Sequence, residues 1–158
     1  MTYNCGEAAG ASRSHKHLQI LPYAACVGED AAFRMFPDAV DDAVARAELP
    51  FCYCISRALP LETDAQAPVE LKRIYDGLVE QAIKETGFRG EQMAHNLVMV
   101  REWMLLIPRS KARVGKCVTG ATGVVGMVWV GSEGEMEEWR GMGFLRALGE
   151  MGMVGRGE

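Results

Sequence analysis

The sequence predicts an α+β fold, an antiparallel sheet with flanking helices. Several short segments of alternating or continuous apolar residues indicate strands, and one long segment has helical spacing. Strands and helices do not alternate in the regular order of parallel βαβ units. A chain of 158 residues with 49% hydrophobic and 24% charged residues has the size and composition of one globular domain, so residues 1–158 are predicted to form a single domain.

The N-terminal third supplies two predicted strands around a loop. The first is the short stretch Met1–Asn4, and the small-residue segment Cys5–Ser14 then forms the loop. The second predicted strand is His15–Pro22, which ends at its proline. Residues 23–48 are ambiguous, although Pro37 favours a short helix over Asp38–Glu48.

The remaining elements follow from aromatic content, periodicity and capping signals. The sequence predicts a strand over Pro50–Ala58 and a helix over Val69–Gly87. The apolar run Asn96–Pro108 forms either one bent strand or two short ones. After a basic loop, Arg109–Gly123, we expect a strand over Gly123–Val130, a helix capped by Ser132 and Glu135, and a glycine-rich tail over Gly149–Glu158 that frays.

Composition argues against several classes of partner. The net charge is −4 and no Lys/Arg cluster is present, which disfavours nucleic acid. No apolar run reaches the roughly 20 residues of a membrane span, and Met1 opens a polar segment unlike a secretory signal. We therefore predict a cytoplasmic protein, with the nucleus as an alternative compartment. We expect no nucleic-acid or membrane partner, and the sequence does not indicate an oligomeric state.

The five cysteines indicate packed, reduced thiols. Their number is odd and no Cys-x-x-Cys pair occurs, which disfavours a disulfide framework or a zinc site. Buried cysteines commonly behave as small apolar side chains. The sequence predicts no metal site.

The segment His15-Lys16-His17-Leu18-Gln19 carries the chemistry. On a strand, His15, His17 and Gln19 share one face, while Lys16, Leu18 and Ile20 share the other. An imidazole is largely neutral near pH 7 and can attack a nucleotide's α-phosphorus, holding the nucleotidyl group covalently. The preceding loop, Gly10–Arg13, and the Gln19 amide could donate hydrogen bonds to phosphate oxygens.

Three plainer interpretations stay open on the residues alone. Two histidines on a strand are commonly surface residues, and Gly10-Ala11-Ser12 could be an ordinary turn. His15 and His17 could also bind a metal, with Cys5, His95 or a carboxylate completing the site at no familiar spacing. The ordered conjunction of loop, histidines and glutamine favours the catalytic interpretation.

Three blocks of the sequence form a recognisable pattern. The most specific block is Asn4-x-Gly6-x-x-x-Gly10-Ala11-Ser12-x-x-His15-x-His17-x-Gln19, and the later blocks are His95–Ser110, with its Pro-Arg pair, and Gly123–Val130. Together they resemble the fungal ATP adenylyltransferases, the diadenosine tetraphosphate (Ap4A) phosphorylases of the histidine-triad superfamily, in which the two later blocks are similar to strands. The resemblance implies a histidine-triad-like fold, with residues 1–22 as active-site loop and strand and residues 95–151 as the C-terminal adenylyltransferase region.

The resemblance also implies a reaction: Ap4A plus phosphate gives ATP plus ADP, reversibly, through an adenylylated histidine. His17 would be the nucleophile and His15 would position phosphates or the leaving group. Other implied nucleotide contacts are Asn4, Gly10, Ala11, Ser12, Arg13, Gln19, Lys116, Cys117, Val118 and Met127. The implied partners are Ap4A, ATP, ADP and phosphate. No cofactor is implied, although Mg2+ could accompany the nucleotide.

The chain departs from the family pattern in places. Arg13-Ser14 replaces a typical glutamine, and Gly131 stands where a lysine is usual. The chain corresponds to the C-terminal portion of longer family members, so we expect an incomplete copy of the fold. The alternatives are a histidine-triad nucleotide hydrolase that uses water as acceptor, or a truncated non-catalytic nucleotide-binding remnant.

Overall fold

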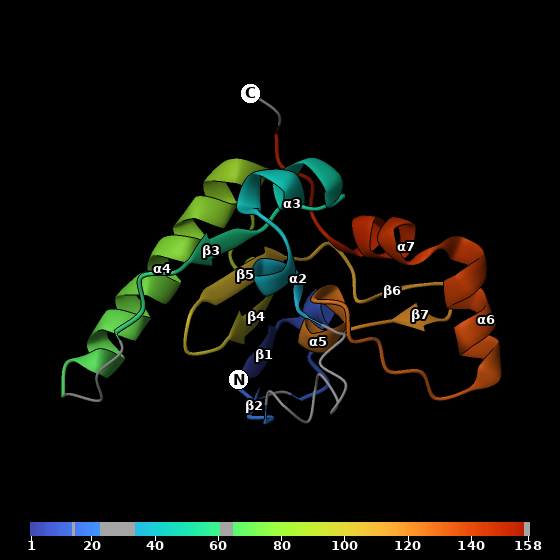
Figure 1. Cartoon of the computed structure of the whole chain (residues 1–158), viewed down its shortest axis with the longest axis horizontal. Helices are drawn as coiled ribbons and strands as arrows, with labels where there is room; N and C mark the ends of the chain where they lie inside the picture. The colour runs from blue at the N-terminus through green and yellow to red at the C-terminus, as the bar shows by residue number, and fades with distance from the viewer. Residues whose placement is uncertain (14, 23–33, 61–64, 157–158) are drawn as a thin grey trace.

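A computed structural model describes residues 1–13, 15–22, 34–60 and 65–156. A five-stranded antiparallel sheet forms its centre, in the order β2-β1-β4-β5-β3 (Figure 1). Its strands are β1 (Thr2–Cys5), β2 (Leu18–Gln19), β3 (Cys54–Ser56), β4 (His95–Met99) and β5 (Met104–Pro108). A separate hairpin pairs β6 (Arg113–Val114) with β7 (Cys117–Val118). The predicted α+β class is confirmed.

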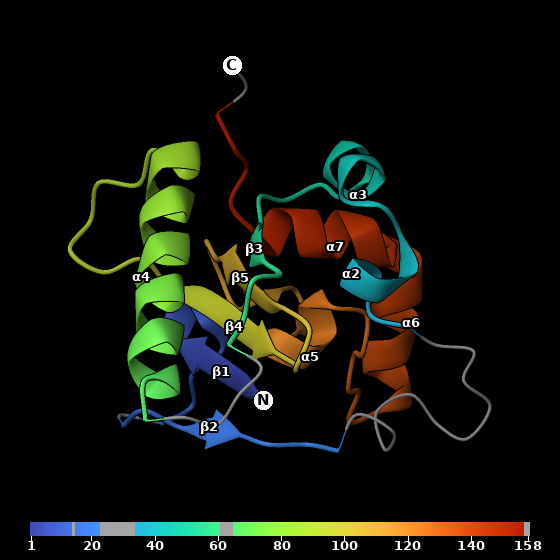
Figure 2. The same cartoon turned by 60° about the vertical axis from the view of Figure 1, so that its left-hand side comes forward.

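Helices cover both faces of the sheet (Figure 2). One face carries α4 (Ala67–Thr86). The other carries α2 (Phe36–Ala39), α3 (Asp42–Glu48), α5 (Ala121–Val124), α6 (Glu133–Met142) and α7 (Phe144–Met151). A short 3-10 helix, η1 (Glu7–Ala9), follows β1.

Strand β5 is buried on both faces, so its residues alternate between two hydrophobic cores. Leu105 and Ile107 pack with Trp139 and the C-terminal helices. Met104 and Leu106 pack instead with α4. The apolar run at 96–108 is therefore continuous because both sides of the strand need apolar cover. It forms two paired strands, β4 and β5, one of the two predicted arrangements.

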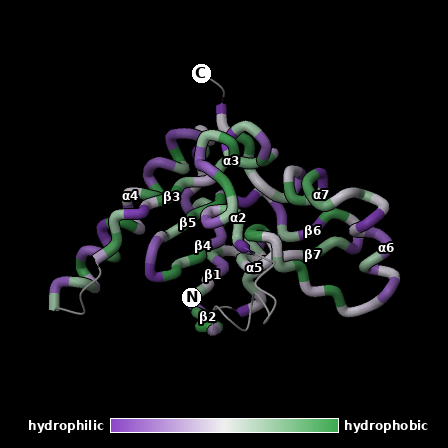
Figure 3. Tube along the Cα trace, viewed as in Figure 1, coloured by the Kyte–Doolittle hydropathy of each residue, from purple (hydrophilic) through white to green (hydrophobic). Residues whose placement is uncertain are grey.

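Helix α4 matches its prediction closely. Ile74, Leu78 and Ala82 recur every four residues and face the sheet. Hydrophobic and hydrophilic residues alternate along the helix, as one buried stripe requires (Figure 3). Gly87 ends it in the left-handed conformation, with φ of +64°.

Two predicted strands are shorter than expected. The segment predicted over His15–Pro22 pairs with β1 only at Leu18–Gln19, because it lies at the sheet edge. The segment predicted over Pro50–Ala58 pairs with β5 only at Cys54–Ser56. The predicted helix over Asp38–Glu48 is two short helices, α2 and α3.

The predicted strand over Gly123–Val130 was wrong. Helix α5 occupies its start, and residues 125–130 form neither helix nor strand. Gly126 has φ of +107°, and the amide of Met127 donates to the Thr122 carbonyl at 2.9 Å. The valines of this segment suggested a strand, because β-branched residues are common in strands. Gly126 instead adopts a positive φ, which turns the chain and is incompatible with a regular paired strand.

The C-terminal tail is held by hydrogen bonds at Met153 and Arg156, against the predicted fraying. The Met153 amide donates to the Pro108 carbonyl at 3.0 Å, and the Cys52 amide donates to the Met153 carbonyl at 2.8 Å. The Arg156 amide donates to the Glu85 carbonyl at 2.8 Å. The tail therefore joins β5, the segment before β3 and the end of α4.

Helix α6 begins with the predicted Ser132 cap, whose hydroxyl accepts from the Glu135 amide at 3.3 Å. The Glu135 carboxylate reaches back to the Gly131 amide at 2.7 Å, one residue before the cap. Within the described ranges, no helix is both long and apolar enough to cross a bilayer.

Candidate functional site

A polar cavity of about 190 Å³ is built from the first nineteen residues. It is lined by Asn4, Gly10, Ala11, Ser12, Arg13, His15, His17 and Gln19. The structure therefore brings together the whole N-terminal set of residues that the sequence singled out. Strand β1, the loop after it and the approach to β2 each supply part of the wall.

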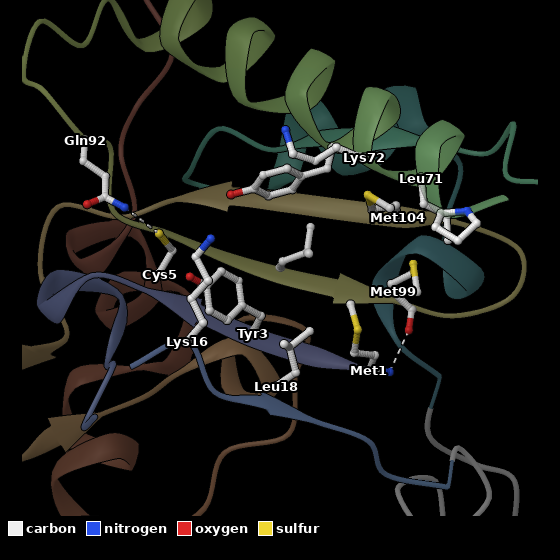
Figure 4. A pocket seen from close by; sticks show the side chains of 13 residues that line it. Met1, Tyr3, Cys5, Lys16, Leu18, Leu71, Lys72, Gln92, Met99 and Met104 are labelled. Carbon is white, nitrogen blue, oxygen red and sulfur yellow. Dashed lines mark hydrogen bonds between the residues drawn. The ribbon is translucent and has the colours of Figure 1, made fainter. Parts of the chain in front are cut away.

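The predicted alternation of side chains is present although the paired strand is short. His15, His17 and Gln19 line the polar cavity. Lys16 and Leu18 line a second cavity of about 430 Å³, which lies between β1 and α4 (Figure 4). An extended backbone is enough to produce this alternation, because it depends on φ and ψ rather than on strand pairing.

His15 and His17 lie close together and open to solvent. Their ring centroids are 6.0 Å apart at an interplanar angle of 80°, and both side chains are exposed. Two imidazoles at this separation can contact one ligand of phosphate size. Arg13, Ser12 and Gln19 are also exposed at the cavity and offer hydrogen-bond donors to an anion.

The backbone conformation at position 10 requires glycine. Its φ is +82°, and a Cβ at this position would lie 3.2 Å from the Thr119 carbonyl oxygen. The Gly10 amide donates to the Glu7 carbonyl at 2.9 Å, and the Ala11 amide donates to Gly6 at 3.2 Å. These two amides are therefore engaged within the turn, so Gly10 and Ala11 do not offer a free N–H to a ligand.

A buried polar network supports the cavity from below. Asn4 Oδ1 accepts from Asn96 Nδ2 at 2.8 Å and from the Ala121 amide at 2.9 Å. Asn96 Nδ2 also donates to the Ala9 carbonyl at 2.8 Å, and Asn96 Oδ1 accepts from the Arg109 guanidinium. The network fixes both the start of the cavity wall, Asn4, and the turn that leads to Gly10.

Arg109 anchors the network, although its side chain is almost fully buried. Its guanidinium donates to the carbonyls of Met151, Lys111 and Thr119 at 3.0–3.3 Å. Burial lowers the pKa of Arg109 to about 10, so the group stays charged at neutral pH.

Sequence reasoning missed Asn96, Arg109 and Ala121 as site-supporting residues. A weak signal existed, because Asn96 and Arg109 are polar residues at the ends of an apolar run. Only the fold shows that both lie beneath the cavity.

The predicted C-terminal nucleotide contacts do not line this cavity. Cys117 is fully buried in a hydrophobic core, and Met127 packs against the same core. Val118 is exposed on the β6–β7 hairpin, and the Lys116 amide donates to Glu138 at 2.8 Å. The segment that reaches Asn4 and Gly10 is instead Thr119–Ala121, which directly follows the hairpin.

His95, the remaining histidine, is buried away from the polar cavity. Its Nδ1 lies 2.9 Å from the Met93 carbonyl, which can only accept, so Nδ1 carries the proton. Nε2 therefore accepts from the Tyr75 hydroxyl at 3.0 Å. His95 and its strand neighbour Cys5 do not line the cavity of His15 and His17, so they do not complete a metal site there.

Two protein-family models match the chain. Residues 47–154 match the ATP adenylyltransferase C-terminal domain. Residues 1–33, which include every residue of the cavity wall, match the Ap4A phosphorylase N-terminal domain. The chain belongs to the ATP adenylyltransferase (Ap4A phosphorylase) family.

Two curated proteins of yeast are similar to this chain. Diadenosine 5',5'''-P1,P4-tetraphosphate phosphorylase 2 of Saccharomyces cerevisiae is 27% identical over 154 residues, which cover 85% of this chain and 46% of the relative. Protein APA1 of the same yeast is 27% identical over 146 residues, which cover 80% of this chain and 43% of APA1. The chain spans about half the length of the curated family relatives that it matches.

Solved structures of the family share the fold. Yeast Ap4A phosphorylase Apa2 in complex with AMP superposes with a TM-score of 0.74 at 25% identity, over 99% of this chain and 56% of that one. Apa2 in complex with Ap4A superposes with a TM-score of 0.70 at 23% identity, over 96% of this chain and 53% of that one. The predicted antiparallel family fold is therefore confirmed.

Proposed function

We propose that this chain carries the nucleotidyl-transfer site of an Ap4A phosphorylase, with His17 as the nucleophile. One observation carries the proposal: His17, His15, Gln19 and the Gly10–Arg13 loop line one polar cavity. Family membership supplies the substrate class, because the related yeast structures are described with AMP and with Ap4A. Catalysis of phosphoryl-type transfer depends mainly on such positioning and on charge stabilisation.

The proposed reaction has two displacements. A ring nitrogen of His17 attacks the α-phosphorus of Ap4A, the phosphorus–oxygen bond to the polyphosphate breaks, and ATP leaves. Inorganic phosphate then attacks the adenylyl-histidine, which releases ADP and restores the imidazole. The sequence is reversible because each step exchanges one phosphorus bond for another.

Side chains around the cavity divide the remaining work. Arg13 and Ser12 donate to the charged phosphate oxygens, and the Gln19 amide binds the transferred phosphate. His15 holds or protonates the leaving oxygen. The Gly10 turn supplies shape rather than free amides, since its own N–H is engaged with Glu7.

Trapping the adenylyl-histidine tests the proposal. The full chain is incubated with Ap4A labelled on the α-phosphorus, quenched in alkali and analysed for an acid-labile adduct. We expect label on the parent chain and none on His17→Ala. Lys16→Ala is the matched control, since Lys16 is the exposed neighbour that faces the other cavity; it should retain the label.

Phosphate dependence separates the alternatives. Release of ADP that requires phosphate supports phosphorolysis, whereas AMP release that ignores phosphate indicates a hydrolase. If no adduct forms on the parent chain under any condition, the chain is a non-catalytic nucleotide-binding remnant and the transfer proposal is wrong.

A further inference from the structure

A second group of reactive side chains lies outside the nucleotide site. Cys52, Cys54 and Glu85 place two thiol sulfurs and a carboxylate oxygen within 4.8 Å of one another. Cys54 opens β3, Cys52 precedes it by two positions, and Glu85 lies in the last turn of α4. Residues two apart in extended backbone point to the same side, so both thiols face the helix end.

The backbone around all three groups is fixed by long-range hydrogen bonds. The Cys52 amide donates to the Met153 carbonyl at 2.8 Å, and Cys54 is paired with Leu106 in the sheet. The Glu85 carbonyl accepts from the Arg156 amide at 2.8 Å. The donor atoms are thus presented by a preformed frame, which reduces the cost of ordering a ligand set.

The Glu85 carboxylate is already oriented toward the thiols. Its Oε1 accepts a hydrogen bond from Gln81 Nε2 at 2.7 Å, and its Oε2 accepts one from the Cys52 thiol at 3.2 Å. Tetrahedral zinc, with ligand bonds of roughly 2.1–2.3 Å, holds neighbouring ligand atoms about 3.5 Å apart. The Cys52–Glu85 separation fits that geometry, and Gln81 acts as the outer partner that orients a ligating carboxylate.

The local charge balance favours a cation. Deprotonated Cys52 and Cys54 with ionised Glu85 would place three negative charges together. The Arg46 guanidinium reaches Glu85 only at 4.0 Å, because it is engaged with Asp42 at 3.0 Å. A bound divalent ion would neutralise two of the three charges.

Access and donor type restrict the ion. Cys54 is fully buried, whereas the Glu85 side chain is 33% exposed, so the group opens to water on the carboxylate side. A water molecule can complete four ligands from that side. Two sulfurs and one oxygen suit a borderline or soft metal, whereas Mg2+ and Ca2+ require oxygen ligands.

We infer that Cys52, Cys54 and Glu85 form a binding site for a divalent cation of the zinc class, with water as the fourth ligand. Binding exchanges two thiol protons for two metal–sulfur bonds and releases both protons to solvent, with no change of oxidation state. The ion would clip the start of β3 to the C-terminal turn of α4.

A cadmium titration of the reduced full chain tests this site. A Cys26→Ser background removes the thiol outside the described residues. The rise of the thiolate-to-metal charge-transfer absorbance should saturate at one ion per chain, and zinc should reverse it. Saturation at one equivalent supports the site, and absence of a saturable signal overturns it.

Matched variants locate the ion. Glu85→Gln keeps size and the Gln81 contact, and we expect it to weaken binding by at least about tenfold, as Cys52→Ser should. Cys5→Ala removes a buried thiol from the other end of the sheet and should bind as the background does. Unchanged affinity in both Glu85→Gln and Cys52→Ser, or an equal loss in Cys5→Ala, would contradict the assignment. Thermal melts of the metal-free variants check that each is folded.

Discussion

Asn96 is a single residue on which two parts of the candidate site depend. Its side chain is completely buried, donates to Asn4 and Ala9, and accepts from Arg109. Its truncation removes one acceptor from the buried Arg109 guanidinium and one donor each from Asn4 Oδ1 and the Ala9 carbonyl, and it leaves a cavity where the side chain was.

We therefore expect Asn96→Ala to lower the free energy of unfolding by about 2–4 kcal/mol. Urea denaturation followed by circular dichroism measures the change. Gln92→Ala is the control, because Gln92 is an exposed amide with a bond to the Cys5 thiol; its effect should stay within about 0.5 kcal/mol. If the two variants lost the same free energy of unfolding, the buried network of Asn96 would contribute no more to stability than an exposed amide does.

Tyr3 and Tyr75 make stability sensitive to alkali. Burial raises the pKa of each phenol to about 12, above the unfolded value of about 10. The folded chain thus keeps protons that the unfolded chain releases. Their contribution is complete below about pH 10 and is lost as pH rises toward 12.

The matching experiment compares the parent chain with Tyr75→Phe in urea at several pH values from 8 to about 11.5. The phenylalanine variant loses the bond to His95 but no longer has a phenol to ionise. We expect its stability to fall less steeply above about pH 10. Parallel curves for the two proteins would argue against a raised Tyr75 pKa.

Among the helices, α4 contains a position where glycine has no structural role. Gly77 is exposed in its middle, and a Cβ there would meet no atom within 4 Å. Gly77→Ala should raise stability by about 0.5–1 kcal/mol, because alanine restricts the unfolded chain and favours the helix. A rise in melting temperature is the readout.

Gly87 provides the opposite control at the end of the same helix. Its φ is +64°, and a Cβ there would overlap the Arg156 guanidinium. Gly87→Ala should lower the free energy of unfolding by about 1 kcal/mol, because alanine is strained in the left-handed region. The melting temperature should fall accordingly. Two shifts of the same sign would contradict this account of the helix.

Element prediction from sequence succeeded where packing and pattern agree. The repeat of Ile74, Leu78 and Ala82 identifies α4 because a long amphipathic stripe has one simple solution. It failed over Gly123–Val130, where valine content suggested a strand but the turn at Gly126 decides the backbone. The tail at residues 152–156 was also mispredicted, because its hydrogen-bond partners are distant in sequence.

At the scale of the whole molecule, two hydrophobic cores share one sheet. Leu106 belongs to the core under α4, while Trp103 and Trp139 belong to the opposite core. Because β5 contributes side chains to both, loss of packing on one face should weaken the other.

Leu106→Ala should lower the free energy of unfolding by about 2–5 kcal/mol. In a Trp129→Phe background, which removes the exposed indole, tryptophan emission and far-ultraviolet circular dichroism should shift to the same lower denaturant midpoint. If the emission midpoint stayed unchanged while the circular dichroism midpoint fell, the two cores would be independent units.

Much of the candidate site could be found from sequence because its wall is contiguous. Asn4 to Gln19 is one short segment, and its alternation requires only extended backbone. The supporting residues Asn96, Arg109 and Ala121 could not be assigned in this way, because only the order of strands in the sheet brings them beneath the loop. Lys116–Val118, which were predicted to contact the nucleotide, do not line the cavity, and the residues that directly follow them reach it instead. The sequence could not show this either, because the position of the hairpin depends on the fold.

The bonds of Asn4 set a time order for the assembly of the polar cavity. Its partners Asn96 and Ala121 follow it by 92 and 117 residues. Chains emerge from the ribosome N-terminus first, so the cavity wall is made long before the residues that hold it. Closing such long loops comes late in folding, since its entropy must be offset by contacts that form afterwards. The residues proposed for catalysis are therefore synthesised before the residues that hold them in place, and they become ordered only after those residues have joined the fold.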